Sequence, residues 1–311
     1  QFIASCVEKG AAAIVLSNEA YLPKEAEGTT YILVENTDRA LGLLAGAWYG
    51  NPSRQLTLVG VTGTNGKTTI ATLLYKLVRA MGYKAGLLST VCNYINDEPV
   101  PATHTTPDAL ELNRLLRRML DAGCQYAFME VSSHAIAQER IAGLDYDGAL
   151  FTNLTRDHID YHKTFDNSRD TKKRLFDNLK SEAFAVTNRD DKNGLVMTQN
   201  CKAKVVSYSC KKPADHSCRI LEQSMDGSLL SLDNTEVWVR LIGEHNAYNL
   251  LAVYACAVEI GIEKEEALIA LSTLKGAPGR LETIKANEGK TVVIDYAHTP
   301  DALENVLRTL K

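Results

Sequence analysis

The sequence predicts an α/β protein built around a parallel sheet with helices on both faces. From Gln55 onward, short apolar segments rich in β-formers alternate with longer segments of helical period. Strands that alternate with helices in this way are typical of a parallel sheet. The chain has 311 residues, a length that suggests about two domains and can bury a large core.

The first 53 residues read as a short α/β fragment. Its expected elements are two helices and two strands, in the order helix, strand, strand, helix, at residues 3–12, 13–16, 31–34 and 37–49. About 50 residues is below the usual size of an independent domain. The chain begins without an initiator Met or a basic signal sequence. We therefore expect residues 1–53 to be part of an N-terminal domain that ends in a linker at residues 51–53.

Residues 54–278 are expected to form the central domain. Its expected strands and helices alternate along the chain, at residues 56–61, 67–81, 85–89, 108–122, 126–131 and 148–152. Three later segments read as short strands with turns between them, at residues 204–208, 229–232 and 237–241. They suggest a small, partly antiparallel appendage to the main sheet. An apolar helix is expected at residues 246–259.

The last 33 residues, 279–311, contain one further strand at 291–295 and one further helix at 301–310. This pair is expected to be the first unit of a third, truncated domain. The predicted fold is therefore a central parallel-sheet domain with a small antiparallel appendage, flanked by partial α/β domains at the N- and C-terminal ends.

The composition is that of an ordinary globular protein, with 45% hydrophobic and 23% charged residues. The formal net charge of −4 gives no reason to expect nucleic acid or an anionic membrane as partner. No apolar run approaches the roughly 20 residues that span a bilayer. The seven cysteines are scattered and include no C-x-x-C pair. We therefore expect reduced thiols in a cytoplasmic protein, without a disulfide framework or a zinc site.

A glycine-rich loop between the strand at 56–61 and the helix at 67–81 is the strongest motif. It comprises Gly63, Thr64, Asn65, Gly66, Lys67, Thr68 and Thr69. Glycines let the backbone amides turn toward phosphate oxygens, and the helix N-terminus favours an anion. The lysine can reach the β- and γ-phosphates, and the first threonine hydroxyl after it can ligate Mg²⁺. Val61 stands where such loops usually begin with glycine, and a glycine turn that binds nothing is the alternative.

The base of the nucleotide is not specified by this loop. Proteins that bind GTP usually carry a separate N-K-x-D motif, and this sequence has none. We therefore expect ATP.

Three further groups of polar residues follow strands or lie on a helix. Glu130 ends the strand at 126–131, where ligands of α/β sheets bind; it is expected to hold Mg²⁺ with Thr68 or to be a solvent-facing strand end. Residues 157–162 bring together Asp157, His158, Asp160 and His162. One of these histidines suits a metal or phosphate, and the others suit a structural role. Lys172 has by pattern alone the character of a solvated surface lysine.

Together these motifs resemble the Mur ligase family. The matching segments are 63–69, the string Glu130-Val-Ser-Ser-His134, residues 152–162, a G-x-x-N-x-x-N element at 243–249, Gly279-Arg-Leu-Glu282 and residues 295–301. They occur in the family's order and cover the chain from about residue 55 to its end. The resemblance implies a ligase that activates a carboxylate with ATP and joins it to an amine.

The resemblance also implies roles for particular residues. The loop at 63–69 would bind ATP, together with Asn246, Asn249, Arg280 and Asp295. Thr68 and Glu130 would hold one Mg²⁺, and His158 with an N-carbamylated Lys172 would hold a second. Lys67, Lys172 and His158 would be the catalytic residues. Contacts to the nucleotide-sugar substrate would come from His104, Thr105, Thr106, Ser132, Gln138 and Arg140. His104 stands where other members often have Asn.

The implied reaction adds the third amino acid of the peptidoglycan precursor. The substrates would be UDP-N-acetylmuramoyl-L-alanyl-D-glutamate and a diamino acid, either meso-diaminopimelate or L-lysine. The reaction would pass through an acyl phosphate in the cytoplasm and serve cell-wall biogenesis, cell shape and division. The protein is expected to be a monomer without nucleic-acid or membrane partners. The family's motif that selects the amino acid is expected beyond Lys311.

Two other enzymes and one protein of another class are alternatives. Folylpolyglutamate synthase shares the ATP loop and the chemistry, but it lacks the string at 130–134 followed by Gln138 and Arg140. Cyanophycin synthetase contains a similar ligase module in a much longer chain. A nucleotide-binding module without ligase activity is disfavoured because Glu130, His158 and Lys172 are all present.

Overall fold

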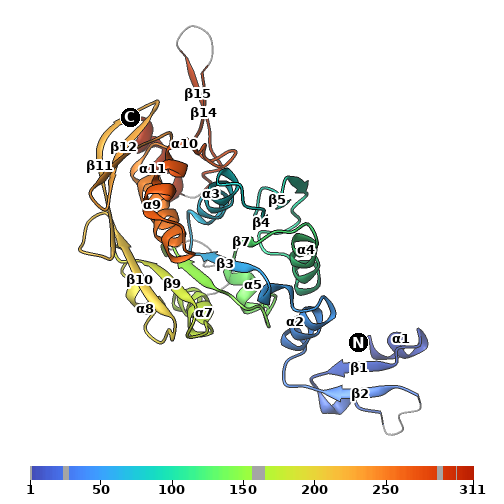
Figure 1. Ribbon diagram of the computed structural model, residues 1–311. Helices are drawn as coiled ribbons and strands as arrows, with labels where there is room; N and C mark the ends of the chain where they lie inside the picture. Colours follow the sequence, from blue (N-terminus) through green and yellow to red (C-terminus); the bar gives the residue numbers. More distant parts are fainter. Residues whose placement is uncertain (1, 24–27, 156–164, 286–289, 299) are drawn as a thin grey trace.

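The computed structural model describes residues 2–23, 28–155, 165–285, 290–298 and 300–311. An eleven-stranded sheet forms the main body, and two two-stranded sheets lie near the two ends of the described chain. Figure 1 shows the N-terminal strands and helix α1 (Ile3–Glu8) standing apart from the main body, to which helix α2 (Thr37–Trp48) leads. The predicted α/β class with a mostly parallel central sheet is confirmed.

The central sheet has the strand order β13-β12-β11-β10-β9-β8-β3-β7-β4-β5-β6. Its parallel part consists of β11 (His216–Ser224), β10 (Lys204–Ser209), β9 (Phe184–Asn188), β8 (Gly148–Phe151), β3 (Thr57–Thr62), β7 (Tyr126–Glu130) and β4 (Ala85–Leu88). Strand β3 pairs with β7 on one side and with β8 on the other. The loop that follows β3 therefore lies in the middle of the sheet edge where ligands bind in such folds.

Helices cover both faces of this sheet. One face packs against α3 (Lys67–Ala80), α9 (Glu244–Glu259) and α10 (Lys264–Thr273). The opposite face packs against α4 (Ala109–Asp121), α5 (Ser133–Ala137), α7 (Phe165–Asp177) and α8 (Gly194–Met197). Strand β3 serves both cores because successive side chains of a strand point to opposite faces. Val59 and Val61 lie in the α3–α9 core, and Leu58 lies in the α4–α7 core.

Both edges of the sheet end in antiparallel strands. At one edge β5 (Asn93–Ile95) and β6 (Glu98–Val100) form a hairpin beside β4. At the other edge β12 (Gly227–Leu232) and β13 (Thr235–Val239) pair antiparallel beyond β11. A small antiparallel part is therefore present as predicted. However, the segment assigned to it at 204–208 joins the parallel part of the sheet, because β10 pairs in parallel with β9.

The N-terminal fragment consists of α1 (Ile3–Glu8), β1 (Ala13–Leu16), the short 3-10 helix η1 (Glu19–Tyr21), β2 (Thr30–Leu33) and α2 (Thr37–Trp48). The two strands pair in parallel. Helix α2 begins after Asn36, whose side chain accepts from the backbone N–H groups of Asp38 and Arg39, as an N-cap does. The expected linker at residues 51–53 overlaps the short 3-10 helix η2 (Pro52–Arg54), in which Pro52 and Ser53 are buried.

The C-terminal elements lie beside the N-terminal ends of helices α3 and α9. Strands β14 (Glu282–Lys285) and β15 (Thr291–Ile294) form an antiparallel hairpin, and α11 spans Pro300–Leu310. A Cβ atom on Gly243, the N-cap of α9, would lie 2.7 Å from Thr309 Oγ1, so α11 touches the start of α9. Within the described residues, no helix is both long and apolar enough to cross a bilayer. All seven cysteines are free thiols.

Candidate active site

The loop between β3 and α3 requires its two glycines. Gly63 and Gly66 have φ of +142° and +88°, values that disfavour other residues. A Cβ atom on Gly63 would lie 2.0 Å from Thr152 Oγ1, and one on Gly66 would lie 2.6 Å from Asn249 Oδ1. The loop is therefore enclosed by the chain after β8 and by helix α9.

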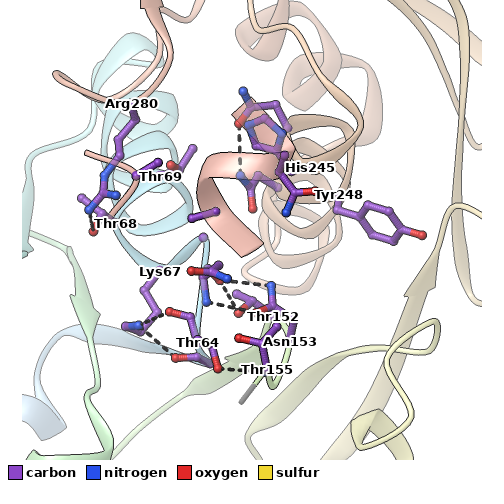
Figure 2. Close-up of a pocket in the computed structure, with 18 of the residues that line it drawn as sticks. Thr64, Lys67, Thr68, Thr69, Thr152, Asn153, Thr155, His245, Tyr248 and Arg280 are labelled. Carbon is purple, nitrogen blue, oxygen red and sulfur yellow. Dashed lines mark hydrogen bonds between the residues drawn. The ribbon is translucent and has the colours of Figure 1, made fainter. Parts of the chain in front are cut away.

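Hydrogen bonds from the segment after β8 hold this loop in shape. Thr152 Oγ1 donates to Asn65 O over 2.6 Å, and the Asn65 backbone N–H donates to Asn153 Oδ1 over 3.0 Å. The backbone N–H of Thr155 donates to Thr64 Oγ1 over 3.1 Å. Figure 2 shows these contacts on one side of the pocket. The structure thus gives Thr152 and Asn153 a clear structural task that the sequence alone did not assign.

Lys67 begins helix α3 and folds back over the loop. Its Nζ donates to the carbonyl oxygens of Gly63 over 2.9 Å and Thr64 over 2.7 Å. Burial lowers the pKa of Lys67, the nearby Glu130 opposes that shift, and Arg280 adds to it. The ammonium group is therefore enclosed in the loop, at the place where a P-loop lysine meets phosphate oxygens.

Glu130, at the end of β7, is 1% exposed, so the expectation of a solvent-facing strand end is wrong. Its Oε1 accepts from the Thr90 backbone N–H over 2.8 Å, and its Oε2 accepts from Thr90 Oγ1 over 3.3 Å. The hydroxyl oxygens of Thr90 and Thr105 lie 3.1 Å apart, so that Thr105 can donate to Thr90. Thr90 was not among the residues predicted from the sequence; its position two residues after the buried strand β4 was the available signal.

Lys172 lies on helix α7 and is 4% exposed, so the expectation of a solvated surface lysine is wrong. Its Nζ donates to Ser168 Oγ over 2.9 Å. Burial, with the positive charge of Lys67, lowers the pKa of Lys172 to about 7. The sequence pattern of α7 did not predict the burial of Lys172, because the helix is rich in charged residues on its other sides.

The residues expected to contact a nucleotide sugar divide into two groups. Thr105 and Ser132 line the pocket. Thr106 lies beneath it: its Oγ1 donates to Glu130 O over 2.8 Å and accepts from the Ser132 N–H over 3.1 Å. Arg140 does not line the pocket; it donates to Thr106 O over 2.9 Å and to Gln138 Oε1 over 2.9 Å.

His104 is exposed and contacts Thr103 Oγ1 at 3.2 Å. The expected histidine and aspartate cluster at 157–162, including His158, lies outside the described residues.

Helix α9 forms the opposite wall of the pocket. Asn246 Nδ2 donates to Ile242 O over 2.9 Å, and Asn249 Nδ2 donates to Asn246 Oδ1 over 3.1 Å. His245 and Tyr248, on the same helix, also line the pocket (Figure 2). The Tyr248 hydroxyl donates to Asp190 Oδ2 over 2.8 Å. Burial lowers the pKa of His245, against the opposing effect of Asp295 and Glu244.

Arg280 and Asp295 reach the pocket from the C-terminal segment. Arg280 donates to Thr68 Oγ1 over 3.3 Å and lies 5.0 Å from the ring centre of Tyr296. Within the described residues, the Arg280 Nε is buried without a hydrogen-bond partner. The Asp295 carboxylate accepts from the backbone N–H of Leu281 over 2.6 Å and of Ala297 over 2.7 Å.

These elements enclose a cavity of about 700 Å³. It brings together most of the residues that the sequence analysis singled out, namely 63–69, Thr105, Glu130, Ser132, Lys172, Asn246, Asn249, Arg280 and Asp295. His104, Thr106, Gln138 and Arg140 do not line it. The cavity has the size of a ligand site, and its donors and cations suit a phosphorylated ligand.

A glycine loop between a central strand and a helix, followed by a lysine and a threonine, defines a P-loop protein of the α/β class. Two family models match the chain: "Mur ligase middle domain" at residues 61–257 and "Mur ligase, glutamate ligase domain" at residues 279–311. The chain belongs to the Mur ligase family. The predicted family resemblance is therefore confirmed.

The chain is similar to two proteins named UDP-N-acetylmuramoyl-L-alanyl-D-glutamate–2,6-diaminopimelate ligase. The one from Parabacteroides distasonis is 58% identical over 98% of this chain, and the one from Bacteroides fragilis is 56% identical over 99%. The chain spans 63% of the length of each relative. A solved structure of an enzyme with the same name is 31% identical, with a TM-score of 0.84 over 99% of this chain and 64% of its own.

Proposed function

We propose that the protein is an ATP-dependent ligase that joins 2,6-diaminopimelate to UDP-N-acetylmuramoyl-L-alanyl-D-glutamate. The observation that carries the proposal is the convergence of Lys67, Glu130 and Lys172, from three separate segments, on one pocket beside the P-loop. The similarity to two relatives of that name supports the choice of substrates. The same similarity favours this activity over that of a folylpolyglutamate synthase.

The proposed reaction begins with ATP in the loop at 63–69. The loop amides and the Lys67 ammonium would bind the phosphates, and the buried, unpaired Nε of Arg280 would gain an anionic acceptor. A carboxylate oxygen of the D-glutamyl residue attacks the γ-phosphorus, and the bond to ADP breaks. The diaminopimelate amine then attacks the resulting acyl phosphate, loses a proton and displaces inorganic phosphate. An amide, ADP and phosphate are the products.

The residues present suit Mg²⁺. The buried Glu130 carboxylate and the Thr68 hydroxyl both line the pocket, and Mg²⁺ prefers oxygen ligands. We propose that these two groups hold one ion, and that Lys172 and His158 serve a second. Mg²⁺ would neutralise charge on the phosphate oxygens during transfer. The Thr90 contacts keep the Glu130 carboxylate in a fixed orientation.

For Lys172 to serve a cation, its own charge must be reversed. We propose that its neutral amine attacks CO₂, forming an N–C bond and releasing a proton, so that an anionic carbamate results. The buried position of Lys172 and its pKa of about 7 support this, because a neutral amine is the nucleophile. The carbamate oxygens are ligands of the kind that Mg²⁺ prefers.

Arg280, Asp295 and helix α9 are proposed to complete the nucleotide site, with Asn246 and Asn249 beside the base. Thr105, Thr106, Ser132, Gln138, Arg140 and His104 are proposed to contact the nucleotide-sugar substrate. We also propose that the protein works as a monomer in the cytoplasm, in peptidoglycan precursor synthesis. Light scattering of the purified full-length protein tests the monomer, and a dimer mass would contradict it.

The test of the activity is phosphate release by the full-length protein with ATP and Mg²⁺. Release should require both UDP-N-acetylmuramoyl-L-alanyl-D-glutamate and 2,6-diaminopimelate, and L-lysine in place of diaminopimelate should support little turnover. Turnover with L-lysine alone would reassign the amino acid. Turnover with a folate substrate, or no turnover at all, would contradict the proposal.

A further inference from the structure

Glu139 occupies a backbone position that ordinarily belongs to glycine. Helix α5 ends in a Schellman motif: the Glu139 N–H donates to Ile136 O over 3.2 Å, and the Arg140 N–H donates to Ala135 O over 2.9 Å. The residue after the C-cap of such a motif has a left-handed conformation and is usually glycine. Glu139 has φ of +54°. A glutamate in this strained position indicates that its side chain has a task.

The Glu139 carboxylate joins three segments of the chain. Its side chain is only 14% exposed. It accepts from the guanidinium of Arg174 on helix α7, and it lies 3.8 Å from the guanidinium of Arg39 on helix α2. Helix α2 also touches this loop directly, because a Cβ atom on Gly42 would lie 2.7 Å from Ala142 O.

Helix α7 is the helix that brings Lys172 to the pocket. Positions two residues apart on a helix point to nearly opposite sides. Arg174 is therefore held by Glu139 on one side of α7 while Lys172 enters the pocket on another. The contact fixes the rotation of α7 about its axis, and with it the direction of the Lys172 side chain.

The neighbours of Glu139 in the chain are Gln138 and Arg140, which hydrogen-bond to each other over 2.9 Å. Arg140 also donates to the Thr106 carbonyl over 2.9 Å, and Thr106 in turn binds the end of β7. The left-handed turn at Glu139 directs Arg140 toward that end of the sheet. One residue thus connects the loop of Gln138 and Arg140 with the helix of Lys172.

We propose that Glu139 is a positioning residue that couples the Gln138–Arg140 loop to helix α7. Through its pair with Arg174, it keeps the loop and Lys172 in one arrangement. The inference rests on the proposed function, because the loop is assigned there to the nucleotide-sugar substrate. Loss of the pair should therefore raise the KM for that substrate and, by shifting Lys172, lower kcat, with the KM for ATP unchanged.

The test uses steady-state kinetics of the full-length protein with four variants. Glu139→Gln removes the charge, Glu139→Gly also removes the backbone strain, Arg174→Gln removes the partner, and Glu139→Gln/Arg174→Gln removes both. Each should raise the KM for the nucleotide-sugar substrate by about fivefold to tenfold, with the KM for ATP changed by less than about twofold. The KM of the double variant for the nucleotide-sugar substrate should not exceed the higher KM of the two single variants Glu139→Gln and Arg174→Gln.

A matched control is Glu111→Gln, which breaks the pair with Arg114 on the exposed face of α4 and should change neither KM. Thermal unfolding separates positioning from folding, since Glu139→Gly should unfold at or above the wild-type temperature. Three results would overturn this inference and leave the proposed function standing. They are an unchanged KM for the nucleotide-sugar substrate in Glu139→Gly, additive effects on that KM in the double variant, and equal rises in the KM values for the nucleotide sugar and for ATP. A wild-type protein without ligase turnover would contradict the proposed function and this inference with it.

Discussion

Lys172 on helix α7 and Lys67 at the start of helix α3 line the same pocket although the two helices cover opposite faces of the sheet. Burial, and then the charge of Lys67, lower the pKa of Lys172 to about 7 from an ordinary 10.5. The positive charge of Lys67 thus favours the neutral amine of Lys172, which is the form that the proposed carbamate requires.

The lowered pKa predicts how stability depends on pH. Between pH of about 7 and 10.5 the folded protein holds Lys172 neutral while the unfolded chain keeps it protonated. Because the unfolded state then binds more protons, the free energy of unfolding should rise with pH through this window. Below pH of about 7 the penalty for a buried charge is fully present. Denaturant unfolding of the wild type and of Lys172→Met, in buffer free of CO₂, measures the difference.

The difference in unfolding free energy between these two proteins should move in favour of the wild type from pH 7 to pH 9. The free energy of unfolding of the wild type, minus that of the variant, should have its lowest value at pH 7 and rise at each higher pH in this range. A difference that is independent of pH would show that Lys172 keeps its ordinary pKa. The same result would weaken the argument for a carbamate.

Removal of the Lys172 side chain should abolish ligase turnover. Lys172→Ala in the full-length protein should lose at least about 100-fold in kcat, as when one group that stabilises transition-state charge is removed. A small carboxylate such as acetate should restore part of the rate, because it can occupy the space of the proposed carbamate. Lys202→Ala, an exposed lysine, is the control. Full activity of Lys172→Ala would rule out the proposed carbamate.

Lys67→Ala should bind nucleotide at least about 100-fold more weakly, because a charge-assisted contact in a preformed site is lost. The variant should remain folded, since the contacts of Lys67 are two carbonyl groups of its own loop. Calorimetric titration with ADP and Mg²⁺ measures the affinity. Wild-type affinity in a folded Lys67→Ala would mean that the loop does not bind phosphate.

Gly63→Ala should distort the loop at residues 63–69 and leave the rest of the fold largely intact. The new Cβ atom would lie 2.0 Å from Thr152 Oγ1, which holds Asn65 in place. We expect a loss of about 1–3 kcal/mol of stability together with weak nucleotide binding. Gly46→Ala on helix α2, where the nearest atom is 3.4 Å away, should leave nucleotide binding unchanged and keep or slightly raise the stability. Equal behaviour of the two variants in thermal melts and titrations would contradict the assigned role of Gly63.

Local sequence pattern was sufficient for the α/β class and for strands β3, β4, β7 and β8, but it missed β9 and β11 of the same sheet. An apolar strand before the glycine loop and a helical pattern after it predicted a phosphate loop between the two, and residues 63–66 do connect β3 with α3. Short polar strands were harder: the β5–β6 hairpin and β14 contain few apolar residues. The place of 204–208 in the sheet was also missed, because the order of strands depends on pairing between segments far apart in the sequence.

Site residues could be predicted where they belong to a motif within one segment of the sequence. They could not be predicted where tertiary packing decides whether a side chain is buried or reaches the pocket. Lys172 shows the limit, since its charged neighbours favoured a solvated position and only tertiary packing buries it. Arg280 meets Thr68 across 212 positions of sequence, which no local pattern encodes. Glu139 was missed for the same reason, because its partners Arg39 and Arg174 are far from it in the sequence.

The chemistry proposed for this pocket is the activation of a carboxylate by phosphorylation. The direct measurement is the fate of ¹⁸O when the full-length protein acts on UDP-N-acetylmuramoyl-L-alanyl-D-glutamate with labelled D-glutamyl carboxylates, ATP and 2,6-diaminopimelate. An acyl phosphate transfers one labelled oxygen to each phosphate released, and mass spectrometry of the phosphate should find it. Phosphate without ¹⁸O, released at the same rate as amide is formed, would contradict the account.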